Sequence, residues 1–173
     1  MKRRKAVQNL ALITGGLALM PACSVEEKEP VFDQLPLEPG DVRLVTKVAD
    51  AILPKADIAI ETPEPTAHFI LNMVNDCYQE KEITRFTRGL QLFKQVIKDE
   101  YQKPFGELNA AQHNLLFTEI THSDIYPKSL KFFLSTMKRL TVRHFTSSSF
   151  FMSQKLDFEF APGRYIGCKD LTA

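Results

Sequence analysis

Apolar residues recur at helical spacing through most of this chain, and proline or glycine separates the periodic stretches. After Pro39-Gly40, Val42, Val45, Val48, Ala49 and Ile52 form one such stretch, which Pro54 ends. Spacings of three and four residues place these side chains on one face of an α-helix. No alternating β-type pattern, internal repeat or β-rich region accompanies them. The sequence therefore predicts an all-α fold.

Four further helices follow from the same reasoning. They are expected over residues 66–78, 80–102, from Asn109 to about residue 120, and 129–145. Asp41 is expected to cap the first helix. Asn109 followed by Gln112 is the spacing of a capping box. With 13 Phe and no Trp, the chain is expected to fold as a compact bundle of about five helices with a Phe-rich core.

The C-terminal part of the chain has a different character. A serine triplet at residues 147–149 breaks the helical pattern, and the residues beyond it include Phe150, Phe151, Phe158, Phe160 and Tyr165. We expect an irregular aromatic tail over residues 150–173. So aromatic a segment is expected to pack against its own helices or against another protein.

The first 22 residues have the features of an export signal. A basic segment at residues 2–5 precedes a mildly apolar run from Ala6 to Met20, which is too short to span a membrane. Arg3-Arg4 before a weakly hydrophobic, glycine-containing run is typical of a twin-arginine signal. A general secretory signal with two incidental arginines is the alternative.

Residues 19–23, Leu-Met-Pro-Ala-Cys, resemble the lipidation site of a lipoprotein, with Cys23 as the attachment point. A plain cleavage site with an incidental cysteine is the alternative. The polar, acidic, proline-containing residues that follow suit a tether. We therefore expect a signal peptide over 1–22, a flexible tether over 23–40 and a helical domain over 41–173. The expected location is the periplasm, with a lipid anchor in a membrane.

Charge argues against a nucleic-acid partner. Four of the 22 basic residues lie at positions 2–5 and no acid precedes Glu26, so residues 23–173 carry 18 basic and 21 acidic residues, a net charge of −3. Such a chain has no general positive field to attract nucleic acid.

No catalytic, cofactor-binding or metal-binding residue can be assigned from motifs. The histidines at positions 68, 113, 122 and 144 lack metal-ligand spacing and are expected to be surface or core residues. Phosphate loops, dinucleotide fingerprints and nucleophile elbows are absent. Asp57, Glu61 and Glu64 are expected in a solvated loop.

If Cys23 carries lipid, Cys77 and Cys168 are the two cysteines left with free side chains. In an oxidising compartment they are candidates for a disulfide between the second helix and the tail. The alternative is two separate thiols, with Cys77 an ordinary core residue.

Several short segments recur in a recognisable order from about Asp41 to Cys168. Beside the twin-arginine start, they are residues 51–55, 69–71, 76–78, 105–108, 140–142, 145–147 and 162–168. The closing Pro-Gly-Arg-Tyr-x-Gly-Cys is the most specific of them. This ordered set resembles subunit 3 of gluconate 2-dehydrogenase, the small subunit of membrane-bound flavin dehydrogenases.

This resemblance implies a non-catalytic accessory subunit that binds no cofactor itself. Its partner would be a large FAD-containing subunit that oxidises a sugar or sugar acid, in some cases with a cytochrome c subunit. A signal on the small subunit could direct export of the folded flavoprotein. Cys23 departs from the family pattern and leaves a cytochrome partner in doubt. The alternative is a stand-alone periplasmic lipoprotein that binds a small ligand or a metal.

Overall fold

The computed structural model describes residues 32–54, 62, 64–156, 158–159, 161 and 163–164. Within these residues it contains helices and no strand, which confirms the all-α prediction. The chain runs through α2 (Asp41–Ile52), α3 (Thr66–Cys77), α4 (Glu80–Tyr101), the 3₁₀-helix η1 (Phe105–Glu107), α5 (Ala110–His122), α6 (Lys128–Thr146) and α7 (Ser149–Lys155). All five predicted helices are present, with observed ends close to those expected from the sequence.

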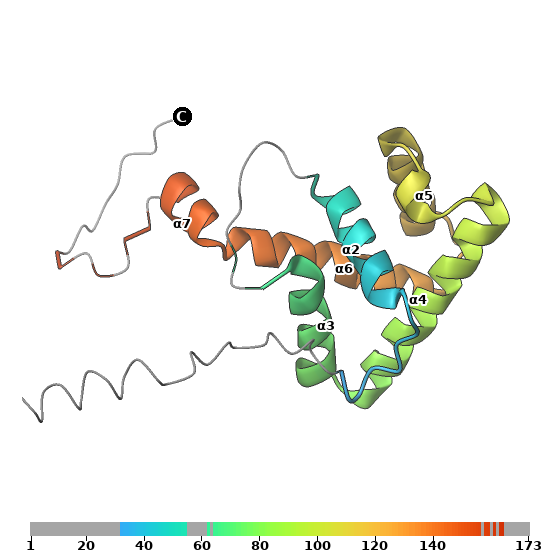
Figure 1. Ribbon diagram of the computed structural model, residues 1–173, viewed down its shortest axis with the longest axis horizontal. Coiled ribbons are helices and arrows are strands. Elements are labelled where there is room, and N and C mark those ends of the chain that lie inside the picture. Colours follow the sequence, from blue (N-terminus) through green and yellow to red (C-terminus); the bar gives the residue numbers. More distant parts are fainter. Residues whose placement is uncertain are drawn as a thin grey trace, which may run out of the picture. The chain divides into compact units, whose positions relative to one another are not determined.

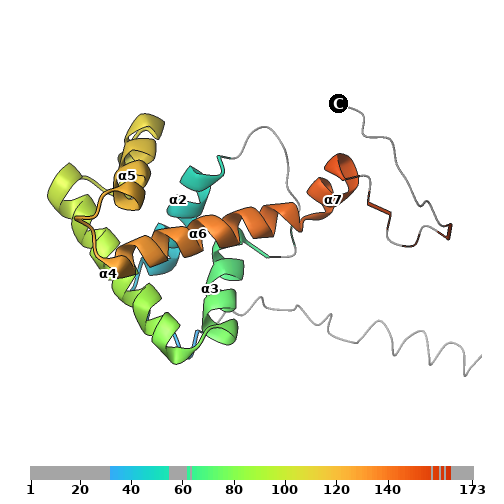
Figure 2. The same cartoon turned by 180° about the vertical axis from the view of Figure 1, so that it is seen from behind.

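Helices α4 and α6 form the central pair of the bundle, and α2, α3 and α5 also contact α6 (Figure 1, Figure 2). Gly89 of α4 permits the close approach of the central pair. A Cβ atom there would lie 2.3 Å from the Ser129 carbonyl oxygen and 2.5 Å from Cβ of Phe133, both on α6. A larger residue would therefore push the two helices apart.

Phenylalanine rings that pack at tilted angles fill the space around these helices. The ring centroids of Phe133 lie 5.1 Å from Phe86 and 5.4 Å from Phe93, and Phe93 lies 5.5 Å from Phe105. All four side chains are buried. Such aromatic pairs add roughly 0.5–1.5 kcal/mol each beyond the area they bury. The prediction of a Phe-rich core is confirmed.

The capping box predicted for α5 is present. The Gln112 backbone N–H donates to Oδ1 of Asn109 over 2.9 Å, and the Asn109 N–H donates to Oε1 of Gln112 over 2.9 Å. At the start of α4, the Gln79 N–H likewise donates to Oε2 of Glu82. These bonds satisfy amides that have no partner within the first turn of a helix.

The prediction that Asp41 caps α2 is wrong. Gly40, with a φ of 98°, occupies the capping position, and Asp41 is the first helical residue. Its carboxylate is buried, accepts the Glu38 backbone N–H over 2.8 Å and lies 2.9 Å from Nζ of Lys94 on α4. Asp41 thus joins the start of α2 to α4, a long-range role that local sequence does not reveal.

Part of the predicted tether lies against the bundle. Leu35 is buried in the core, and the Gln34 N–H donates to Oδ1 of Asn75 on α3 over 2.9 Å. Apolar side chains in this segment account for the packing, which begins upstream of the boundary expected at residue 41.

The prediction of an irregular tail is wrong over residues 150–155, which belong to α7 (Ser149–Lys155). The serine triplet does interrupt the helical path, but Ser148 then starts the next helix. Its Oγ accepts the Phe151 N–H over 3.2 Å and donates to the Phe145 carbonyl. Two turns are too short for apolar periodicity to show in the sequence.

Candidate partner-binding surface

The C-terminal end of the described chain exposes apolar side chains that its own helices do not cover. Helix α7 follows α6 directly and contacts it, partly through an edge contact between the rings of Phe145 and Phe151 at 5.3 Å (Figure 1). No residue of α7 is buried. Leu156 is 57% exposed and Phe158 51%. Two exposed apolar side chains so close in the chain make this segment a candidate interaction site.

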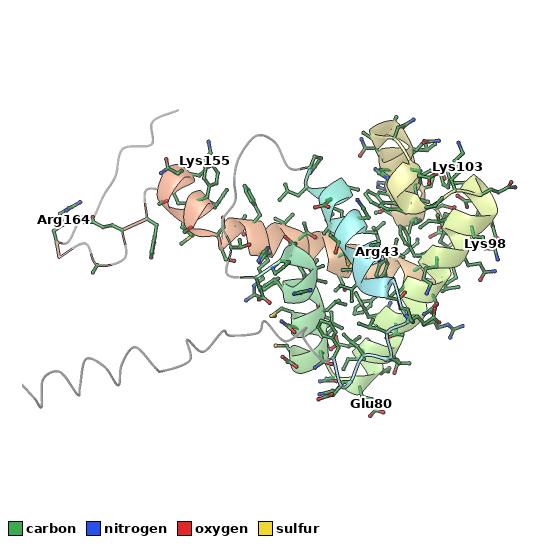
Figure 3. The ribbon with its side chains drawn as sticks, viewed as in Figure 1. Arg43, Glu80, Lys98, Lys103, Lys155 and Arg164 are labelled. Atoms are coloured by element: carbon green, nitrogen blue, oxygen red, sulfur yellow. The ribbon has the colours of Figure 1, made fainter. Side chains whose placement is uncertain are left out.

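Basic residues accompany this apolar segment. The charged side chains of α6 are Lys128, Lys131, Lys138, Arg139 and Arg143, with no Asp or Glu among them. Lys155 projects from α7 (Figure 3). Arg139 is held in place, because it donates to the Tyr78 hydroxyl and lies over the Tyr78 ring, 5.8 Å from its centroid. Of these basic residues, Arg143 in the last turn of α6 and Lys155 in α7 are the ones closest in the chain to the exposed apolar residues.

His144 is a buried residue of α6 rather than a ligand on the surface. Its Nδ1 lies 3.1 Å from Oγ1 of Thr66, and its ring packs at a tilted angle against Phe69, with centroids 4.7 Å apart. Burial lowers the pKa of His144, while the nearby Glu64 acts in the opposite direction. The ring is therefore held neutral and links the end of α6 to the start of α3.

His113 also has a structural environment. Its ring stacks on Phe105 at a centroid distance of 4.3 Å, and Nε2 lies 3.1 Å from the Phe105 carbonyl oxygen. Within the residues that the structure describes, no group of His, Cys, Asp or Glu is placed to hold a metal ion. In the same residues, no helix has the length and apolar character needed to cross a membrane.

The other predicted site residues fall largely outside the described part of the chain. Arg3, Arg4, Cys23 and Cys168 lie there, as do Asp57 and Glu61. Cys77 is exposed at the end of α3, so it is not the core residue that one alternative required. Glu64 accepts a 2.9 Å hydrogen bond from the Asn72 amide. The predicted disulfide between Cys77 and Cys168 remains a prediction.

A basic cleft beside α6 escaped the sequence reasoning. It has a volume of about 630 Å³ and is lined by residues of α2, α4, α5 and α6. Lys128, Lys131, Ser135 and Lys138 contribute from α6. Their spacing of three, four and three residues places them on one helix face. This spacing is the sequence pattern that could have predicted a basic surface on α6.

Comparison with known protein families places these features in context. Residues 39–163 match the family described as gluconate 2-dehydrogenase subunit 3. The chain belongs to this family. Neither curated proteins nor solved structures give a significant match. Membership in the subunit 3 family associates the chain with a multi-subunit dehydrogenase, and the match spans α2 to α7.

Proposed function

We propose that this chain is a non-catalytic small subunit of a periplasmic, flavin-dependent sugar or sugar-acid dehydrogenase. In this proposal it binds and stabilises a large FAD-containing subunit and helps to export it. FAD belongs to that partner, and a cytochrome c subunit is a possible third component. Membership in the subunit 3 family supports the assignment to a dehydrogenase complex.

The observation that carries the binding role is the pair of exposed apolar side chains directly after α7. Leu156 is 57% exposed and Phe158 51%, whereas the apolar residues of α7 itself are half-buried. A partner surface would remove the exposed side chains from water, which favours association. In this proposal the subunit acts by binding its partner through these C-terminal residues, and it needs no pocket for substrate.

The export role rests on the signal-like N-terminus. Arg3 and Arg4 fit a twin-arginine signal, and that route carries folded proteins. A cofactor-loaded partner without its own signal could therefore cross with this chain. Lipid on Cys23 would then hold the complex at a membrane surface, with the residues after Cys23 as a connection.

Paired substitutions at the C-terminal segment test the binding role. Leu156→Ser with Phe158→Ser removes two apolar groups that are more than half exposed, so the fold should tolerate the change. If each side chain contributes about 1–2 kcal/mol at the interface, recovery of the flavoprotein with the tagged chain should fall roughly tenfold or more. Flavin fluorescence of the eluate measures this recovery.

Leu115→Ser provides the matched control, because Leu115 on α5 is 55% exposed and lies outside this segment. It should leave recovery of the flavoprotein unchanged. Equal recovery with the double variant and the control would contradict the assigned surface, and absence of any flavoprotein from the wild-type eluate would contradict the function itself.

A further inference from the structure

The cleft beside α6 contains four cationic side chains and no carboxylate. Its charged lining residues are Arg85 of α4 and Lys128, Lys131 and Lys138 of α6, with His122 at the end of α5. A volume of about 630 Å³ is within the range of small-molecule sites. Acids outnumber bases over residues 23–173, yet the charged residues that line this cleft are all basic.

The spacing of the lysines indicates the size of the ligand. A rise of 1.5 Å per residue separates the α-carbons of Lys128 and Lys138 by about 15 Å along α6. A single monovalent ion would contact one end of this array. A molecule with two or more anionic groups could engage several of the cations together.

Arg85 is already ordered at the cleft. Its guanidinium carbon lies 4.6 Å from the centroid of the Phe132 ring, and Nη2 donates to the Lys128 carbonyl over 3.3 Å. The guanidinium has five N–H donors, so this bond leaves others for a ligand. Ordering in advance reduces the entropy lost when an anion binds.

The start of α6 adds a further preference for negative charge. Pro127 caps this helix without a side-chain hydrogen bond, so amides of the first turn have no side-chain partner at the cap. The positive end of the helix dipole lies at the same place, beside Lys128. This contribution supplements the cationic side chains.

Existing ion pairs neutralise little of this charge. Nζ of Lys131 lies 3.4 Å from Oδ1 of Asp124, whose side chain is fully exposed, and such a pair is weak in water. Within the described residues, Lys128 and Lys138 have no ion pair. Mutual repulsion among these cations disfavours the empty cleft, and a bound anion would relieve it.

From this arrangement we infer that the cleft binds a polyvalent oxyanion, a molecule with at least two phosphate or carboxylate groups. Phe117 and Leu134 also line the cleft, so the anionic groups can be attached to an apolar body. A soluble metabolite and a phospholipid headgroup share this chemistry. The inference goes beyond the proposed role as a subunit and does not depend on it.

Thermal unfolding and calorimetric titration with pyrophosphate and citrate test the inference. Either anion should raise the Tm saturably, and by more than sodium chloride at equal ionic strength, because ligand that binds only the folded state stabilises it. Lys131→Ala with Lys138→Ala should weaken binding at least tenfold. Without ligand, the Tm of this variant should be equal to or above that of the wild type, since repulsion is reduced.

Lys98→Ala with Lys103→Ala is the matched control, because these lysines lie in the last turn of α4 and just beyond it, where they line a different cleft (Figure 3). The control should bind as the wild type does. If the double variant of the cleft does not fold, Lys138→Gln at an exposed position replaces it. Equal loss of binding in control and cleft variants, or a Tm change no larger than that with sodium chloride, overturns the inference.

Vesicles separate the two sources of oxyanion, with Cys23→Ser in every sample so that lipid at this position does not contribute. Binding to cardiolipin vesicles, whose headgroup has two phosphates, but not to phosphatidylcholine vesicles, lost in the cleft variant, supports a lipid headgroup. Saturable binding of pyrophosphate or citrate without vesicle binding supports a soluble ligand. Binding of a polyglutamate peptide alone overturns the inference and assigns the cleft to an acidic protein segment.

Discussion

His144 illustrates how a single ionisable side chain becomes part of the core. It lies on α6, packs against Phe69 and pairs with Thr66 at the start of α3. Burial disfavours the charged imidazolium and so lowers the pKa of His144. From sequence, His144 was expected to be either a surface or a core residue, and its partner 78 residues away could not be inferred.

The lowered pKa of His144 predicts acid sensitivity. Because the folded pKa lies below the unfolded value of about 6.5, the stability that neutral His144 provides is complete above that pH. It is lost as pH falls toward the folded pKa, since the unfolded chain binds the proton first. Urea unfolding from pH 7 to pH 5 should therefore show a smaller loss of stability in His144→Gln than in the wild type.

His122→Gln is the control for this experiment, since His122 is exposed at the end of α5. It should keep the wild-type dependence of unfolding free energy on pH. If His144→Gln kept the same dependence too, other groups would account for the acid sensitivity.

The pKa of Lys94 is shifted in the opposite direction to that of His144, so its contribution to stability is lost at alkaline rather than acidic pH. Desolvation lowers its pKa, but hydrogen bonds and charge interactions with Glu38 and Asp41 outweigh this effect and raise the pKa overall. The stabilisation from this pair is present below the unfolded pKa and is lost as pH rises through the folded value. Partial exposure of Lys94 to solvent weakens the interaction.

At the scale of elements, the contact between α4 and α6 depends on the small size of Gly89. Gly89→Ala would place a methyl group against the Ser129 backbone, which cannot move aside as a flexible side chain can. The resulting separation of the helices should destabilise the protein by about 1–3 kcal/mol. Urea denaturation with a helical circular dichroism signal measures the change.

Gly106→Ala is the matched control for Gly89→Ala. Its added Cβ would lie 3.5 Å from the Lys47 side chain, an ordinary contact. The free energy of unfolding should change much less than at Gly89. Equal effects at the two positions would contradict the account of the α4–α6 contact.

Sequence patterns predicted the helices better than the surfaces between them. The apolar stripe of α4 and the capping box at Asn109 are local signals, and both appear in the structure. The ion pair of Asp41 and Lys94 joins residues 53 positions apart, so it required the folded arrangement. The basic cleft combines side chains of separate helices and was missed for the same reason.

At the scale of the whole molecule, a disulfide between Cys77 and Cys168 would connect the tail to α3. Closing a loop of ~90 residues should stabilise the protein by about 2–5 kcal/mol. Cys77→Ser should lower the free energy of unfolding by this amount, and reductant should then have no further effect. Alkylation followed by intact-mass measurement counts the free thiols, and two thiols that react without reductant would contradict the pairing.

The described domain offers a partner surface more readily than a catalytic centre. Helices α2 through α6 all contribute residues to its core, which contains buried phenylalanines, whereas α7 has no buried residue. Together with membership in the subunit 3 family, this division supports an accessory role. In the complex that we propose, the partner would supply the chemistry, and this chain would supply contact, stability and an export signal.

Affinity purification of the tagged full-length chain from native membranes tests this account most directly, with the flavin spectrum recorded and partners identified by mass spectrometry. The account predicts that a large FAD-containing oxidoreductase co-purifies and that dehydrogenase activity remains with that partner. A colourless preparation of this chain without a partner would contradict it.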